Sequence, residues 1–201
     1  MTGVKYVADD EDGVSPIEQA ELMIALFQSI DRDCFDLRLS AKNGEILELI
    51  PALSPDAVLR RLPELLTEAE GQAFGVAIRP VDKGRQGGLS LFRLDGLDPL
   101  SMDQVKHGAF LVLETEPKIY QCWFAVDKRQ LQRLPSLSSK LASDNLARTT
   151  QNHFAPLAGS RRAASVESPL VRIARGSAGL LMPASQPSSS MQLLLDQCIL
   201  Q

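Results

Sequence analysis

The chain has 201 residues, 44% of them apolar and 23% charged, with a formal net charge of −4. This length and composition suit one globular domain with extensions. No run of about 18 apolar residues is present, so we expect no membrane-spanning helix, and the acidic first residues lack the apolar segment of a signal peptide. We therefore expect a cytoplasmic protein. Its three cysteines form no CxxC motif, which indicates free thiols rather than a zinc site.

The first residues predict a mobile segment followed by a helix. Residues 1–14 are polar and acidic, and we expect them to be mobile. Ser15-Pro16-Ile17-Glu18 matches a capping box, with serine at the cap and glutamate three residues later. Apolar residues recur at helical spacing from there to about Ile30. We predict a helix over residues 15–30.

A hairpin and a second helix are predicted next. Residues 35–39 alternate between apolar and polar, residues 46–50 form a second apolar run, and Asn43-Gly44 between them suits a tight turn. A second helix is predicted from Ser54 towards residue 70. We expect a break at Pro63, because proline lacks the backbone donor that a helix needs.

The middle of the chain is rich in predicted strands. One strand over residues 74–78 ends at Arg79, and a glycine-rich loop containing Lys83 follows it. Three further apolar runs of strand length lie close together, at residues 89–94, 109–113 and 119–126. The first of them ends in Asp95-Gly96-Leu97-Asp98. A carboxylate at the end of a buried strand can meet a metal ion or a phosphate, so we place the candidate site here.

A short helix and a charged turn are predicted between these apolar runs. Ser101 is predicted to cap a short helix that ends near His107. The turn before the third run, residues 114–118, sets two glutamates and Lys118 beside the same edge of the predicted sheet.

Positive charge gathers in the last third of the chain. Residues 127–175 hold nine Lys and Arg against three Asp and Glu, and they follow the candidate acidic site directly. Within them we predict a helix over residues 127–147, a basic loop over 148–165 and an edge strand over 170–174. Residues 176–201 are predicted to be a flexible tail, rich in serine and proline, with a short apolar segment near its end.

Strands and helices alternate without a regular period, and at least one hairpin is present. This pattern predicts an α+β fold with a mixed or antiparallel sheet flanked by helices. We place the folded domain at residues 15–175.

Three features, taken in order, connect the chain to a known family. The first is a strand followed by Asp95-Gly96-Leu97. The second is the motif Glu114-Thr115-x-Pro117 with Tyr120-Gln121-x-Trp123, and the third is the later segment from His153 to Arg162. In this order they resemble the RepB-like primase domain of the archaeo-eukaryotic primase-polymerase superfamily. The resemblance covers roughly residues 35–174. It implies a sheet flanked by helices, with acidic residues on strand ends.

The resemblance also implies a chemistry, nucleotidyl transfer with Mg²⁺ or Mn²⁺, in which two or three carboxylates converge on a pair of ions. The acid pair of the family falls on Asp95 and Gly96, so only Asp95 is retained as a carboxylate. Asp98 is a candidate for the second acid, and Asp144 or its neighbour Asn145 falls where the family has its third. The predicted catalytic and metal residues are therefore Asp95, Asp98 and Asp144. For each of them the alternative is an ordinary turn or helix-surface residue.

Cations near these acids would bind the triphosphate or the template. We expect Arg79, Lys83, Lys118, His153, Arg161 and Arg162 to do so. The segment departs from the family at Pro156, which stands where the family has arginine. Tyr120 and Trp123 are candidates for base stacking, although aromatic residues in a central strand are more often part of the core.

The sequence thus leaves two main functions open. The first is a primase that makes or extends primers on single-stranded DNA from nucleoside triphosphates, in plasmid or mobile-element replication, with a helicase or relaxase as a further partner. The second keeps the fold but not the reaction, and binds single-stranded nucleic acid or a replication partner. A third possibility is a domain whose tail or acidic N-terminus recruits another protein and has no role with nucleic acid. Losing a carboxylate and the motif arginine bears on activity rather than on the fold.

Overall fold

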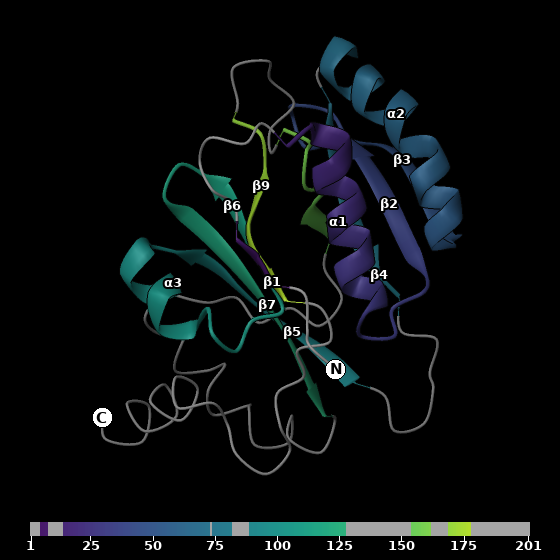
Figure 1. Ribbon diagram of the computed structural model, residues 1–201. Coiled ribbons are helices and arrows are strands. Elements are labelled where there is room, and N and C mark those ends of the chain that lie inside the picture. The colour runs from purple at the N-terminus through teal and green to yellow at the C-terminus, as the bar shows by residue number, and fades with distance from the viewer. Residues whose placement is uncertain are drawn as a thin grey trace.

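The computed structural model describes residues 5–7, 14–72, 74–81, 89–127, 154–161 and 169–177. These residues form an α+β fold in which all strand pairs are antiparallel, so the predicted fold class is confirmed. One sheet has the order β1-β9-β6-β7-β5 and the other the order β3-β2-β4-β8 (Figure 1). The elements are β1 (Lys5–Val7), α1 (Pro16–Gln28), β2 (Phe35–Ser40), β3 (Ile46–Leu53), α2 (Pro55–Gln72), β4 (Gly75–Pro80), β5 (Leu89–Leu97), α3 (Pro99–Val105), β6 (Leu111–Glu116), β7 (Ile119–Asp127), β8 (Ala155–Pro156) and β9 (Arg172–Ser177).

Helix α1 joins the two sheets. Its predicted capping box is present: the Glu18 backbone N–H donates to the Ser15 hydroxyl, and the Ser15 N–H donates to the Glu18 carboxylate. Farther along the helix, the ring of Phe27 lies edge-on to three aromatic rings. Their centroids are 5.3–6.0 Å away, and they come from both halves of the fold: Phe35, Phe110 and Trp123. The helix therefore packs between the sheets, as Figure 1 shows, and closes the main core.

The four-stranded sheet separates apolar from polar residues by alternation along β2. Phe35, Leu37 and Leu39 are buried in the core with α1 and α2. The residues between them, Asp36 and Arg38, point to the opposite face, because successive side chains of a strand alternate. This second face carries the cluster described below.

Strand β3 stands at the end of its sheet and is the most exposed of the strands whose burial is described. Ile46, Leu47 and Leu49 are each more than half exposed. Two features interrupt its second half: Pro51, which has no backbone N–H, and Ala52, which has a φ of 55°.

Helix α2 differs from the prediction. We expected a break at Pro63, but α2 runs without interruption through this residue. The lost backbone bond is tolerated because the helix is held by its apolar side, where Val58, Leu62 and Leu65 are buried. The proline ring itself lies on the exposed side of the helix.

The five-stranded sheet is built on the hairpin β6–β7, to which β5 adds on one side and β9 on the other. We expected the last strand, near residues 170–174, to be an edge strand. Instead β9 lies inside the sheet, because β1 pairs with it from the segment that we expected to be mobile. Helix α3 covers the second face of this sheet over a smaller core that includes Val112, Cys122 and Phe124.

Several sequence predictions fall outside the described residues. These are the helix over 127–147 except Asp127, which ends β7, residues 148–153 and 162–165 of the basic loop, and the tail beyond residue 177. None of the helices in the described ranges is long and apolar enough to cross a membrane.

Candidate functional site

Asp95 lies near the end of β5, where the sequence predicted a functional carboxylate, but it has a partner on its own strand. Arg93 is two residues earlier, so its side chain shares a face of the strand with Asp95. Its guanidinium donates to Asp95 Oδ2 from Nε at 2.9 Å, and Nη2 lies 2.8 Å from the same oxygen. The second carboxylate oxygen, Oδ1, accepts a hydrogen bond from the side chain of Gln121.

Two side chains of the neighbouring strand β7 hold the Arg93–Asp95 ion pair in position. Arg93 stands opposite Trp123 in the β5–β7 register, and its guanidinium carbon lies 5.3 Å from the indole centroid. The Trp123 ring N–H donates to Gln121 Oε1 at 2.9 Å, which sets the orientation of the amide that binds Asp95. The Arg93 side chain is only 9% exposed and that of Asp95 26%, so the ion pair is largely withdrawn from solvent.

Phe154 connects this pair to the other sheet. Arg93 Nη1 donates to the Phe154 carbonyl oxygen at 3.1 Å. The guanidinium carbons of Arg38 on β2 and Arg79 on β4 each lie 4.7 Å from the centroid of the Phe154 ring. Three arginines from three strands therefore meet at one aromatic residue. We call these four residues the Phe154 cluster.

Asp36 on β2 holds Arg79 of the cluster in position. Asp36 faces Arg79 across the β2–β4 register, and Oδ2 accepts hydrogen bonds from Nε at 3.0 Å and from Nη2. Its other oxygen accepts the Ala52 backbone N–H at 2.8 Å. Arg38 Nε is buried and makes no hydrogen bond within the part of the chain that the structure describes.

The cluster combines excess positive charge with an aromatic ring. Within the residues that the structure describes, three guanidinium groups contact two carboxylates, those of Asp36 and Asp95, which is an excess of one positive charge. Guanidinium groups bind phosphate oxygens through paired hydrogen bonds, and an aromatic ring offers a stacking surface for a base. The arrangement can bind a phosphodiester chain.

The described acids do not fit a shared site for divalent ions. Both oxygens of Asp95 are occupied by Arg93 and Gln121. Asp98, the predicted second acid, is the N-cap of α3 and accepts the Ser101 backbone N–H at 2.7 Å. The helix is therefore capped by Asp98, not by Ser101 as predicted. In the described ranges no three His, Cys, Asp or Glu side chains are grouped as metal ligands would be.

The electrostatics of Asp98 agree with a cap. Hydrogen bonds from the Ser101 backbone and hydroxyl lower the pKa of Asp98 below its ordinary value of 3.8. The carboxylate is fully exposed. Its position follows from the helix start at Pro99, since aspartate is one of the preferred residues before a first turn.

The structure brings together only some of the predicted cationic residues. Arg79 belongs to the Phe154 cluster. Lys118 is exposed in the β6–β7 turn, with a φ of 64°, and its backbone N–H donates to Glu114 at 2.9 Å. Arg161 lies 3.4 Å from Glu70 of α2. The remaining predicted site residues lie outside the described residues: Lys83, Asp144, His153 and Arg162.

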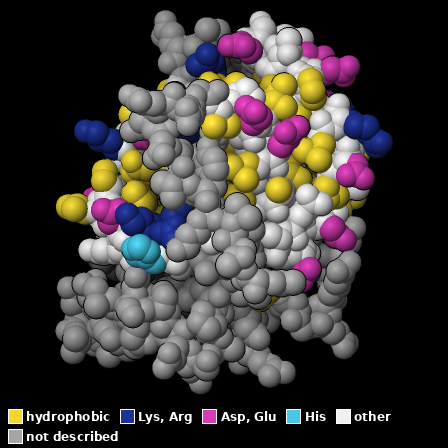
Figure 2. All heavy atoms as spheres, in the orientation of Figure 1, with side chains coloured by type: hydrophobic (Ala, Val, Ile, Leu, Met, Phe, Trp, Pro, Cys, Tyr) yellow, Lys and Arg dark blue, Asp and Glu magenta, His cyan; other side chains and the backbone are white. Residues whose placement is uncertain are grey.

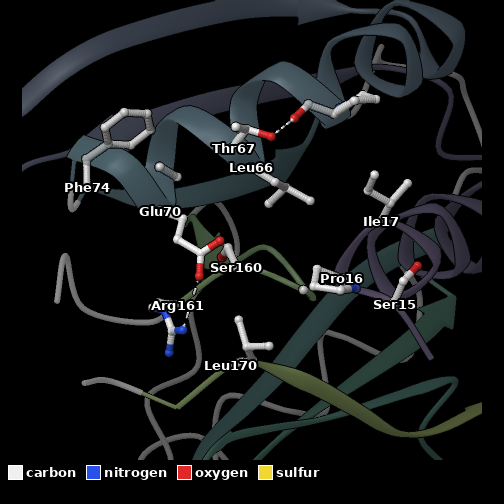
Figure 3. A pocket seen from close by; sticks show the side chains of 13 residues that line it. Ser15, Pro16, Ile17, Leu66, Thr67, Glu70, Phe74, Ser160, Arg161 and Leu170 are labelled. Atoms are coloured by element: carbon white, nitrogen blue, oxygen red, sulfur yellow. Dashed lines mark hydrogen bonds and ion pairs between the residues drawn. The ribbon is translucent and has the colours of Figure 1, made fainter. Parts of the chain in front are cut away.

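Arg161 stands at a cavity separate from the Phe154 cluster. The cavity has a volume of about 220 Å³ and lies between the start of α1, the second half of α2 and residues 159–161. Figure 3 shows Leu66, Ile17 and Leu170 on its walls and the Arg161–Glu70 pair beside it. No residue of the Phe154 cluster lines it.

The visible surface near α2 and β3 also argues against a nucleic-acid site there. Figure 2 shows mainly acidic and apolar side chains over this half of the molecule, with Lys and Arg side chains at its margins. Residues 42–72, which form this surface, hold six Asp and Glu against three Lys and Arg, and a net negative charge repels a phosphate backbone.

Sequence reasoning missed three residues of the cluster. Arg93 was placed inside an apolar run, although a charge two residues before Asp95 shares its face. Arg38 alternates with buried leucines in β2, which signals a charge on the second face. Phe154 carries no local signal, because its role depends on contacts from three distant strands.

The fold defined by these two sheets is that of primase catalytic domains. The chain matches the catalytic domain of primase RepB′, solved in complex with initiator DNA, with a TM-score of 0.64 and 21% identity over 91% of this chain and 95% of the other. A second RepB′ structure matches with a TM-score of 0.62 and 23% identity over 91% of this chain, which spans 62% of that longer chain. The primase-polymerase domain of cyanophage S-2L matches with a TM-score of 0.54 and 15% identity, over 87% and 96% of the two chains.

These matches confirm the predicted resemblance at the level of the fold. No protein-family model matches the chain, and no curated protein matches its sequence.

Proposed function

We propose that the chain is a primase-fold domain that binds single-stranded DNA at the Phe154 cluster. The observation that carries the proposal is the convergence of Arg38, Arg79 and Arg93 on one phenylalanine. A strand of DNA presents phosphates and bases at every nucleotide, and the cluster offers a partner for each.

Two observations support this assignment. Arg79 and Arg93 are held in position by ion pairs, so little side-chain entropy remains to be lost on binding. In addition, the RepB′ catalytic domain of the same fold was crystallised with initiator DNA.

The test is a salt titration of binding to a labelled single-stranded oligonucleotide, followed by fluorescence anisotropy. Each phosphate contact contributes about 0.7 to the slope of log K against log salt for single strands. We expect Arg38→Ala to lower the slope by about this amount. The matched control is Arg61→Ala, which removes an exposed arginine of α2 that lies 4.0 Å from Glu48. An equal change in both variants, or no binding at low salt, would contradict the proposal; the latter would favour a domain that recruits a protein.

A second candidate function is template-directed nucleotidyl transfer. It is favoured by the position of Asp95, a carboxylate near the end of β5 in contact with the cluster, in a primase fold. In this proposal the domain extends primers from nucleoside triphosphates with Mg²⁺ or Mn²⁺, in cytoplasmic replication of a plasmid or other mobile element, beside a helicase or relaxase. Asp144 is the proposed partner acid.

This candidate is tested with primed and unprimed single-stranded templates, labelled nucleotides and Mn²⁺. Product that disappears in Asp95→Ala would establish the reaction. Absence of product from the wild-type chain would remove the second candidate and leave the first intact.

A further inference from the structure

We infer that Arg93 takes the place at Asp95 that a divalent cation would occupy, so that the cluster carries its own cation and works without a metal ion. The inference rests on the proposed DNA-binding function for the location of the site, and it is incompatible with the second candidate, nucleotidyl transfer with a metal ion at Asp95. It goes beyond that function by assigning Arg93 and by predicting what the site does not need.

The first argument is the geometry of the pair. Nε and Nη2 of Arg93 approach the same oxygen, Asp95 Oδ2, at 2.9 and 2.8 Å. A metal ligand oxygen points a lone pair at the ion, and here the guanidinium fills that position. The other oxygen is held by Gln121, whose amide is oriented by Trp123. A divalent ion would have to displace both partners.

The second argument is charge. Asp95 contributes one negative charge, and Arg93 already compensates it in a largely buried site. An ion with two positive charges placed at the same carboxylate would lie beside a guanidinium that cannot lose its proton. The like charges repel, and this repulsion is strong where solvent is excluded.

The third argument is the position of Arg93 between the two sheets. Its third nitrogen, Nη1, donates to the Phe154 carbonyl oxygen at 3.1 Å. The same guanidinium therefore neutralises the strand-end carboxylate and positions the residue that Arg38 and Arg79 contact. Arg93 is a positioning residue for the Phe154 cluster.

The experiment measures Mn²⁺ binding to the full chain by electron paramagnetic resonance, which reports free Mn²⁺. We expect the wild type and Asp95→Asn to take up the same amount, because Asp95 binds no ion. The control is Asp103→Asn, which removes an exposed carboxylate paired with Lys106. Arg93→Asp replaces the cation by a second carboxylate on the same strand face, and we expect roughly ten-fold tighter Mn²⁺ binding than in the wild type.

A second measurement follows DNA binding in Mn²⁺ and in EDTA at matched ionic strength. We expect the wild-type affinity to agree within about two-fold, and Arg93→Gln to weaken it while Arg93→Lys restores part of it. The inference is overturned if the wild type binds a Mn²⁺ ion that Asp95→Asn loses and Asp103→Asn keeps. It also fails if folded Arg93→Asp gains no Mn²⁺ binding. Should circular dichroism show Arg93→Asp to be unfolded, the comparison of wild type with Asp95→Asn decides.

DNA binding that persists in EDTA supports the proposed function whatever the Mn²⁺ result. Loss of all DNA binding with unchanged Mn²⁺ uptake would contradict the proposed function alone. The two failures are therefore distinguishable.

Discussion

The Phe154 cluster and the cavity beside Arg161 differ in how they use arginine. Both involve the short stretch of residues 154–161. At the cluster, guanidinium groups from three strands converge on Phe154, and among the described residues they outnumber the two carboxylates that contact them. At the cavity a single arginine is paired with Glu70, which is 67% exposed, and several of the neighbouring walls are apolar. An arginine therefore indicates a binding surface only where further cations converge with it.

The largest expected effect is a loss of stability from a substitution beside the cavity. Gly159 has a φ of 81°, and an added Cβ would lie 1.9 Å from the Pro16 carbonyl oxygen at the start of α1. Because the clash is with backbone, Gly159→Ala should lower the free energy of unfolding by about 2–5 kcal/mol, the sum of backbone strain and overpacking. Denaturant unfolding followed by circular dichroism measures it.

Gly44→Ala is the matched control for this prediction. Gly44 has a similar φ of 84°, but nothing lies within 4 Å of an added Cβ. Only the backbone strain remains, and we expect a loss of about 1 kcal/mol. Equal losses at the two sites would mean that the contact of residue 159 with α1 contributes nothing.

An effect of intermediate size is expected on DNA binding, where substitutions in the cluster and at the cavity should differ. Phe154→Leu removes the ring while keeping an apolar side chain, and we expect the affinity for single-stranded DNA to fall by about 1–3 kcal/mol, the range for one base stack. Arg161→Ala should leave the affinity and the salt slope unchanged. This differs from the sequence-based expectation that Arg161 contacts nucleic acid. If Arg161→Ala lowered the affinity and Phe154→Leu did not, DNA would bind at the cavity and not at the Phe154 cluster.

The smallest effect concerns Asp98. Its pKa in the folded chain is lowered by hydrogen bonds from Ser101, so the carboxylate stabilises the fold above the unfolded pKa near 3.8. This contribution is lost as the pH falls through the lower, folded pKa. In Asp98→Ala the pH dependence of stability should flatten between about pH 5 and pH 2. A measured curve that stays parallel to that of the wild type would show that the cap contributes no pH dependence.

Local signals sufficed for much of the fold. The capping box at Ser15 placed α1, and Asn43-Gly44 placed the β2–β3 hairpin, because both features depend on residues a few positions apart. Strands β5, β6 and β7 were found from their apolar runs. The position of β9 between β6 and β1 was not predicted, because pairing with a distant strand leaves no mark on either sequence.

The site was predictable only in outline. Asp95 and Arg79 were among the predicted site residues; Arg79 belongs to the Phe154 cluster and Asp95 contacts it, and their functional roles stay predictions. Their state was not predictable. Whether a carboxylate binds an ion or a guanidinium depends on which side chain shares its strand face, and whether an arginine is available depends on partners such as Asp36 on another strand.

Strand β3 bears on how the protein behaves at high concentration. An edge strand offers unpaired backbone groups to a second molecule, and exposed leucine and isoleucine side chains add apolar surface. Together they make such a strand a template for aggregation. Here Pro51 withholds a donor, and the left-handed backbone of Ala52 turns the chain out of the extended path. An incoming strand can follow the edge for only a few residues, which limits fibre-like growth.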